Sequence, residues 1–132
     1  MGLSHYAILG AHPRVKVVSI CDGATYITSA LNKYTGIETY KDYRKMFDSA
    51  QLDCVIVATP TSTHFDIASE AIERGLHVFV EKPLCLDPRQ SKRLTELANA
   101  KGCITQVGYH NRFIGTFRET QRLVQEIGRA HV

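Results

Sequence analysis

The chain has 132 residues, of which 44% are hydrophobic and 22% are charged, and its formal net charge is +3. This length and composition fit one globular domain that can bury its own core. Acidic and basic residues are interspersed, which argues against a nucleic-acid-binding stripe. No apolar run is long enough to cross a bilayer, and the first residues lack a secretory signal. We therefore expect a cytoplasmic protein with no nucleic-acid or membrane partner.

The four cysteines do not form a recognisable framework. They are widely spaced and include no C-x-x-C pair; they are Cys21, Cys54, Cys85 and Cys103. Three of them lie in or beside apolar runs, where a free cysteine usually acts as a small buried hydrophobe. We predict neither a disulfide framework nor a metal site, because ligand spacing is absent.

Helical and strand-like runs alternate along the whole chain. In order, the patterns predict a helix over 3–11, a strand over 15–21, a helix over 24–34, a strand over 38–40, a helix over 42–47, a strand over 53–58, a helix over 64–74, a strand over 77–80, a helix over 88–100, a strand over 103–108 and a helix over 114–125. Such alternation is typical of βαβ units, so we predict an α/β fold with a doubly wound, mostly parallel sheet.

Several residues mark where these helices begin and end. Gly36 and Gly102 are expected helix stops, and Asp87 followed by a proline predicts an N-cap. Ser62 or Thr63 is expected to cap the helix that begins near residue 64. The strand over 53–58 is nearly all apolar, as expected for a strand covered on both faces.

The chain opens directly on a helix, with no strand before it. In a dinucleotide-binding unit, a G-x-G-x-x-G turn follows the first strand, and an acidic residue about 20 positions later binds the ribose hydroxyls. Gly2 stands at the helix start and Asp22 ends the next strand, 22 − 2 = 20 positions later. Gly2 is readable as the last glycine of this fingerprint. We therefore expect a Rossmann-like sheet whose first strand and most of whose glycine-rich loop are missing.

The triplet Glu81-Lys82-Pro83 follows the predicted strand over 77–80. Ligands bind at the carboxyl ends of strands in open α/β sheets. An acceptor, a donor and a rigid backbone at such a point suggest a functional site. The alternative is a solvated surface pair, because most lysines and glutamates are exposed.

With these motifs, the chain resembles the Gfo/Idh/MocA family of nicotinamide-dependent oxidoreductases. The similarity covers the amino-terminal Rossmann domain over nearly the whole chain. It is carried by Met1-Gly2, Cys21-Asp22 and the segments 57–64, 81–84 and 107–113. The resemblance implies binding of NAD or NADP and action on a sugar, polyol or nucleotide sugar.

The resemblance also implies roles for individual residues. Those expected to hold the cofactor are Gly2, Asp22, Ala58, Thr59, Pro60, His64, Glu81 and Lys82. Asp22 would hold the adenosine ribose, while Glu81 and Lys82 would lie near the nicotinamide. Lys82 is the expected catalytic residue, orienting the substrate or assisting proton transfer. A carboxylate at position 22 would repel a 2′-phosphate, which favours NAD while leaving NADP possible.

We expect two regions along the chain. Residues 1–125 would be a truncated dinucleotide-binding domain. Residues 126–132 would begin a missing second domain or be a sequence artefact, since a common sequencing-adapter read encodes the same heptad. The resemblance implies that the second domain binds the small-molecule substrate and that the full-length parent is a homo-oligomer.

Two functional alternatives remain open at this point. The chain could be a regulatory Rossmann module that binds a nucleotide without catalysing a reaction. It could also be an inactive fragment, because pyrophosphate binding depends on the glycine-rich loop as well as on the helix amino terminus. We expect the full-length parent to be the enzyme and this chain alone to be inactive.

Overall fold

The structure is a computed structural model, and it describes residues 2–129. Strands alternate with helices throughout this part of the chain. The elements are α1 (Gly2–Gly10), β1 (Ser19–Cys21), α2 (Thr25–Thr35), β2 (Glu38–Tyr40), α3 (Tyr43–Ser49), β3 (Cys54–Val57), η1 (Thr61–Thr63), α4 (His64–Glu73), β4 (His77–Val80), α5 (Pro88–Lys101), β5 (Thr105–Val107), η2 (His110–Phe113) and α6 (Gly115–Arg129).

The strands form two parallel sheets. β1 pairs with β2, and β3, β4 and β5 form a second sheet in that order. Within residues 2–129 no ladder joins β1 to β3. In the Rossmann strand order 3-2-1-4-5-6, β1 and β3 of this chain take the places of strands 2 and 4. These two strands flank strand 1. The sheet is therefore divided at the position where the sequence predicts a missing strand.

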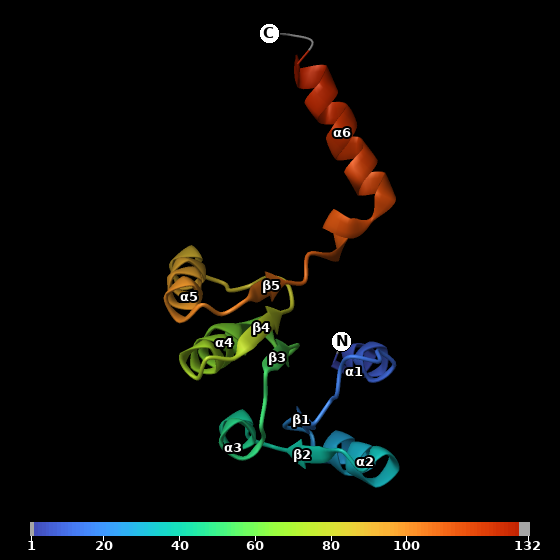
Figure 1. The fold of residues 1–132 in the computed structure, drawn as a ribbon, viewed down its shortest axis with the longest axis vertical. Helices are drawn as coiled ribbons and strands as arrows, with labels where there is room; N and C mark the ends of the chain where they lie inside the picture. The colour runs from blue at the N-terminus through green and yellow to red at the C-terminus, as the bar shows by residue number, and fades with distance from the viewer. Residues whose placement is uncertain (1, 130–132) are drawn as a thin grey trace.

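Helices lie on both sides of the strands (Figure 1). α3, α4 and α5 lie on one side, whereas α1 and α2 lie on the other. This arrangement confirms the predicted doubly wound α/β class. The last helix, α6, extends away from the layers, and its apolar residues Phe117, Val124 and Ile127 are exposed.

The core lies mainly between the larger sheet and α4. Alternate residues of β3 and β4 are buried, among them Val57 and Val80, and they pack with Ile72 and Ala71 of α4. Their neighbours along the strand, such as Ile56, are only half-buried. The expectation that β3 is fully covered on both faces was wrong, because α1 has no fully buried residue and covers that side incompletely.

Most predicted helix and strand positions are confirmed. β2 and β4 have the predicted bounds, and Gly36 and Gly102 end their helices with positive φ angles of 69° and 65°. Asp87 caps α5 by accepting a hydrogen bond from the backbone N–H of Arg89 at 2.8 Å.

Three local predictions were wrong. The strand predicted over 15–21 is confined to Ser19–Cys21, and the one over 103–108 to Thr105–Val107. The paired residues are limited to 19–21 with β2 and 105–107 with β4, although Ile104 and Gly108 each still share one main-chain hydrogen bond with β4. The hydroxyl of Thr63 does not cap α4; it donates to the carbonyl oxygen of Pro60 at 2.8 Å within the preceding 3₁₀ turn.

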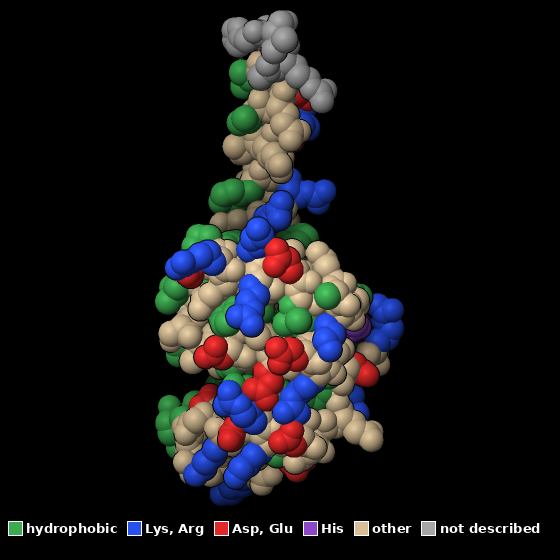
Figure 2. Space-filling model, turned by 90° about the vertical axis from the view of Figure 1, so that its left-hand side faces the viewer, with side chains coloured by type: hydrophobic (Ala, Val, Ile, Leu, Met, Phe, Trp, Pro, Cys, Tyr) green, Lys and Arg blue, Asp and Glu red, His purple; other side chains and the backbone are tan. Residues whose placement is uncertain are grey.

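The surface of one face carries mixed charge. Lysine and arginine side chains alternate with aspartate and glutamate over α3, α4 and α5 (Figure 2). None of the helices in the described residues is both long and apolar enough to span a membrane. The predicted helix over 114–125 continues to Arg129, and residues 130–132 of the heptad singled out above lie outside the described residues.

Candidate functional site

The carboxyl ends of the three strands in the larger sheet form one edge. Main-chain hydrogen bonds continue to the last residues of the ladder: the N–H of Glu81 donates to Val57 at 2.9 Å, and that of Gly108 donates to Val80 at 2.8 Å. Ala58, Glu81 and Gly108 follow β3, β4 and β5 directly. The edge predicted from the sequence is therefore present, and three parallel strands supply its residues.

Glu81 is buried at this edge, with 9% of its surface exposed. Oε1 lies 2.8 Å from Nε2 of His5 in α1, and Oε2 accepts the backbone N–H of Lys82 at 3.2 Å. Burial alone would raise the pKa of this carboxyl. The hydrogen bonds from His5 and Lys82, together with their charges, outweigh burial and hold the pKa of Glu81 below its usual range.

A close approach of the chain just after β5 helps to enclose Glu81. A Cβ at Gly108 would lie 3.1 Å from Oε2 of Glu81 and 3.1 Å from Cζ of Phe79. The His5 ring packs edge-on against Phe79, with ring centroids 5.4 Å apart. A side chain at position 108 would therefore require Phe79 and Glu81 to shift, and the carboxylate lies among α1, β4 and the chain after β5.

His64 joins the loops that follow β3 and β4. Its ring is 1% exposed, with Nε2 2.9 Å from the carbonyl oxygen of Thr59 and Nδ1 2.9 Å from that of Pro83. Carbonyl oxygens only accept, so the ring acts here as a donor to the backbone. The structure therefore places His64 between the two loops, and its contact with a cofactor remains a prediction.

The side chains around this buried centre are open to solvent. Lys82 is exposed and follows Glu81 directly, and the Lys82–Pro83 peptide bond is cis. Thr59 and Pro60 are exposed, and Ala58 is half-buried. These residues line one edge and are accessible to a ligand.

Asp22 lies at the carboxyl end of β1, in the smaller sheet. Its backbone N–H donates to Tyr40 at 3.0 Å, which aligns it with the end of β2. Oδ1 accepts the backbone N–H of Ala24 at 2.8 Å, just before α2 begins. The second carboxylate oxygen accepts no hydrogen bond from residues 2–129, as recognition of a ribose hydroxyl requires.

The structure brings some predicted residues together and not others. Thr59, His64, Glu81 and Lys82 meet around the ends of β3 and β4. In the described part of the chain, no hydrogen bond links Asp22 or Gly2 to this group. Gly2 is exposed at the start of α1, where a Cβ would meet nothing within 4 Å.

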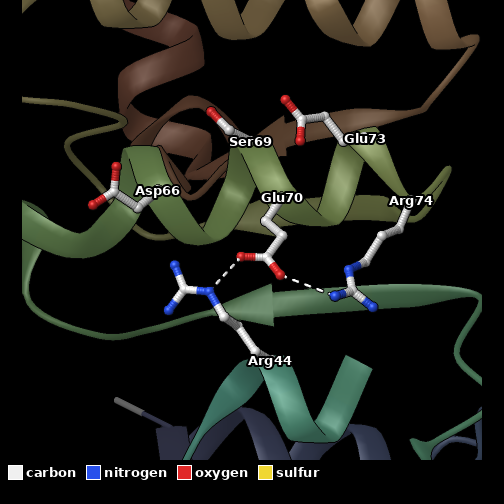
Figure 3. Close-up of a pocket in the computed structure, with 6 residues that line it drawn as sticks. All are labelled: Arg44, Asp66, Ser69, Glu70, Glu73 and Arg74. Atoms are coloured by element: carbon white, nitrogen blue, oxygen red, sulfur yellow. Dashed lines mark hydrogen bonds and ion pairs between the residues drawn. The ribbon is translucent and has the colours of Figure 1, made fainter. Parts of the chain in front are cut away.

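A surface hollow between α3 and α4 is distinct from this edge (Figure 3). Its centre is Glu70, which accepts from Nε of Arg44 and from Nη2 of Arg74, both at 3.0 Å. Arg74 also pairs with Asp48 at 2.6 Å. Arg44, Glu70 and Arg74, three of the residues that line the hollow, form these ion pairs, so we interpret them as a brace between the two helices.

Comparison with known proteins decides the family. A model of an oxidoreductase family with an NAD-binding Rossmann fold, GFO_IDH_MocA, matches residues 1–109. The chain belongs to the Gfo/Idh/MocA family. This membership confirms the resemblance drawn from the sequence motifs.

Individual relatives of this Gfo/Idh/MocA chain are dehydrogenases. Scyllo-inositol 2-dehydrogenase (NAD(+)) of Bacillus subtilis is 35% identical over 120 residues, which are 89% of this chain and 35% of that protein. The WlbA dehydrogenase of Bordetella pertussis, crystallised with NADH and UDP-GlcNAcA, superposes with a TM-score of 0.86 at 25% identity, covering 95% of this chain and 38% of that one.

A third relative supports the same fold. Scyllo-inositol dehydrogenase of Lactobacillus casei, with bound NAD(H) and scyllo-inositol, gives a TM-score of 0.84 at 23% identity and covers 95% of this chain and 38% of that one. The chain thus spans between a third and two fifths of the length of these relatives.

Two residues of the candidate site were not predicted from the sequence of this Gfo/Idh/MocA chain. His5 contacts Glu81 across 76 positions, and Gly108 approaches the same carboxylate. The sequence shows His5 on the same helical face as Leu9, four positions later, which marked a face towards the sheet. Gly108 is the last residue of the strand predicted over 103–108, and a glycine in a strand can mark a close approach of another part of the chain.

Proposed function

We propose that this chain is the cofactor-binding part of an NAD-dependent oxidoreductase that acts on a sugar, polyol or nucleotide sugar. The observation that carries this proposal is the buried Glu81 carboxylate beside the exposed Lys82 at the carboxyl edge of a parallel sheet. That edge is where ligands bind in this type of fold. Family membership and the dehydrogenase activities named for the relatives support the proposal.

The residues present fit the adenosine ribose and the phosphates of a dinucleotide. Asp22 has one carboxylate oxygen free for ribose hydroxyls, while its other oxygen is held by the backbone. The start of α1 at Gly2 is open, and backbone N–H groups at a helix amino terminus favour phosphate. Ala58, Thr59 and Pro60 would line the cofactor along the same edge.

When bound, the nicotinamide supplies the hydride acceptor or donor. Lys82 would orient a substrate hydroxyl or carbonyl and assist proton transfer, because its amine is exposed at the edge. His64 would hold the Thr59 and Pro83 loops in place from beneath. Such positioning contributes to catalysis by keeping reacting groups in a productive geometry.

The substrate pocket would involve residues outside this chain. The relatives named above are more than twice as long as this chain. We propose that a second domain of the full-length parent binds the substrate and that the parent assembles as a homo-oligomer, whereas the 132 residues alone are inactive.

Cofactor binding tests the proposal. Calorimetry with NAD and NADP would compare the intact gene product with Asp22→Asn and, as a control, Asp87→Asn. Both aspartates accept a backbone N–H at 2.8 Å, so each asparagine removes a charge from a similar turn. We expect the NAD preference to fall about tenfold only in Asp22→Asn, because the carboxylate repels a 2′-phosphate.

Two outcomes would contradict this reading. Failure of the wild-type protein to bind either nucleotide would remove the dehydrogenase function. Equal effects of the two substitutions would remove the role of Asp22. Turnover assays with inositols, glucosides and nucleotide sugars then separate an enzyme from a nucleotide-binding regulatory module.

A further inference from the structure

His5 and Glu81 connect two elements that are far apart in the sequence. Nε2 of His5 lies 2.8 Å from Oε1 of Glu81. A carboxylate oxygen only accepts, so Nε2 carries the proton and donates it. The same ring contacts Phe79 edge-on at 5.4 Å. One side chain of α1 therefore holds both the last aromatic residue of β4 and the carboxylate that follows it.

The first helix has few other attachments to the sheet. None of its residues is fully buried, and Leu3 and Ile8 are exposed. Within residues 2–129, the bond to Glu81 is the one side-chain hydrogen bond that joins α1 to a strand or its exit loop. The position of α1 over this edge therefore depends strongly on His5.

Glu81 transmits this contact to the loop that carries Lys82. Oε2, the oxygen that does not face His5, accepts the backbone N–H of Lys82 at 3.2 Å. The carboxylate is thus held at one end by α1 and holds the first peptide of the loop at the other. The backbone after β5 also runs close to this carboxylate, since a Cβ placed at Gly108 would lie 3.1 Å from Oε2.

We propose that His5 is a positioning residue that, through Glu81, fixes the amino end of α1 relative to Lys82. The inference rests on the proposed function, in which the start of α1 faces the cofactor phosphates and Lys82 faces the nicotinamide. One hydrogen bond then sets the geometry between the phosphate and nicotinamide parts of the cofactor site.

Substitutions at His5 separate this role from general packing. His5→Leu fills much of the space but has no donor, whereas His5→Gln keeps one. His12 is an exposed histidine that follows α1, so His12→Leu is the matched control. Hydrogen exchange of α1 amides in the intact gene product should accelerate about tenfold in His5→Leu, as expected for one charge-assisted hydrogen bond. Exchange should be partly restored in His5→Gln and unchanged in His12→Leu.

The pH dependence provides a second readout. The charged or titratable groups that face the Glu81 carboxylate are His5 from α1 and Lys82 from its own loop. As the pH falls through the lowered pKa of Glu81, the carboxylate is protonated and the bond weakens. Exchange of α1, corrected for its intrinsic pH dependence, should then rise in the wild type and stay constant in His5→Leu.

Cofactor measurements distinguish positioning from a purely structural role. We expect His5→Leu to weaken NADH binding and to slow hydride transfer, with His5→Gln between it and the wild type. Unchanged α1 exchange in His5→Leu would overturn the inference, even if NADH binds. Faster exchange with unchanged NADH affinity and hydride transfer would also overturn it. If the wild type binds no nicotinamide nucleotide, the proposed function and this positioning role fall together, while the exchange data still report whether the His5–Glu81 bond secures α1.

Discussion

Replacing Gly108 with alanine tests the crowding at the candidate site directly. The new methyl group would lie 3.1 Å from Cζ of Phe79, 3.1 Å from Oε2 of Glu81 and 3.3 Å from its Cδ. Carbon atoms in contact prefer a separation of about 3.5–4.0 Å, so the ring and the carboxylate must both move. Neither moves freely, because His5 packs on the ring and bonds to the carboxylate.

Two opposing terms set the expected magnitude for Gly108→Ala. Overpacking a filled site costs about 1–3 kcal/mol. Restricting the unfolded chain by changing glycine to alanine returns about 0.4–1 kcal/mol. We therefore expect the free energy of unfolding to fall by about 1–2 kcal/mol. Gly23→Ala is the control, because a Cβ there meets nothing within 4 Å and the φ angle is not positive.

Urea unfolding of the intact gene product, followed by circular dichroism, measures both variants. Gly108→Ala should unfold at lower urea with an unchanged slope, and Gly23→Ala should match or exceed the wild type. A double mutant with Glu81→Ala should tolerate the methyl better, because the carboxylate it meets is gone. Wild-type stability in Gly108→Ala, or an undiminished penalty in the double mutant, would refute the described contact.

Three further outcomes are expected. His64→Ala should lower the free energy of unfolding by about 3 kcal/mol in a melting experiment, because the buried ring no longer links the loops after β3 and β4 and a cavity opens. Burial, with the Asp42 and Asp22 carboxylates, raises the pKa of Cys21 to about 11, so its alkylation at neutral pH should be slow and should accelerate in Asp22→Asn. Glu70→Gln should destabilise the protein at low salt and less so at about 1 M salt, where ion pairs are screened.

Helix and strand bounds were predicted correctly where neighbouring residues in the sequence determine them. β4 could be predicted at its observed bounds because an apolar run ends at the Glu81-Lys82-Pro83 triplet. Asp87 marks the start of α5 and Gly102 its end, and both act through neighbouring backbone groups. The strand predicted over 15–21 was too long for a non-local reason, because its partner β2 pairs only with Ser19–Cys21.

The same distinction between local and long-range determinants applies to the residues of the candidate site. Glu81 and Lys82 could be predicted because a ligand edge follows from the strand that precedes them. The partnership of Glu81 with His5 spans 76 positions and depends on how α1 lies over the sheet. The need for glycine at 108 depends on a contact with another strand. No pattern within a short window contains either fact.

The two sheets carry different parts of the candidate site, so their relation matters for function. Asp22 ends β1 in the smaller sheet, whereas Glu81 and Lys82 end β4 in the larger one. With no ladder between β1 and β3 in the described residues, backbone pairing does not hold these groups at a set separation. Side chains connect the two parts instead, since His5 ties α1, which leads into β1, to Glu81, and Glu70 braces α3 against α4. Weakening the His5–Glu81 bond or the Glu70 ion pairs should therefore change the spacing between the residues that hold the ribose of a cofactor and those that hold its nicotinamide. Neither group of residues should change by itself.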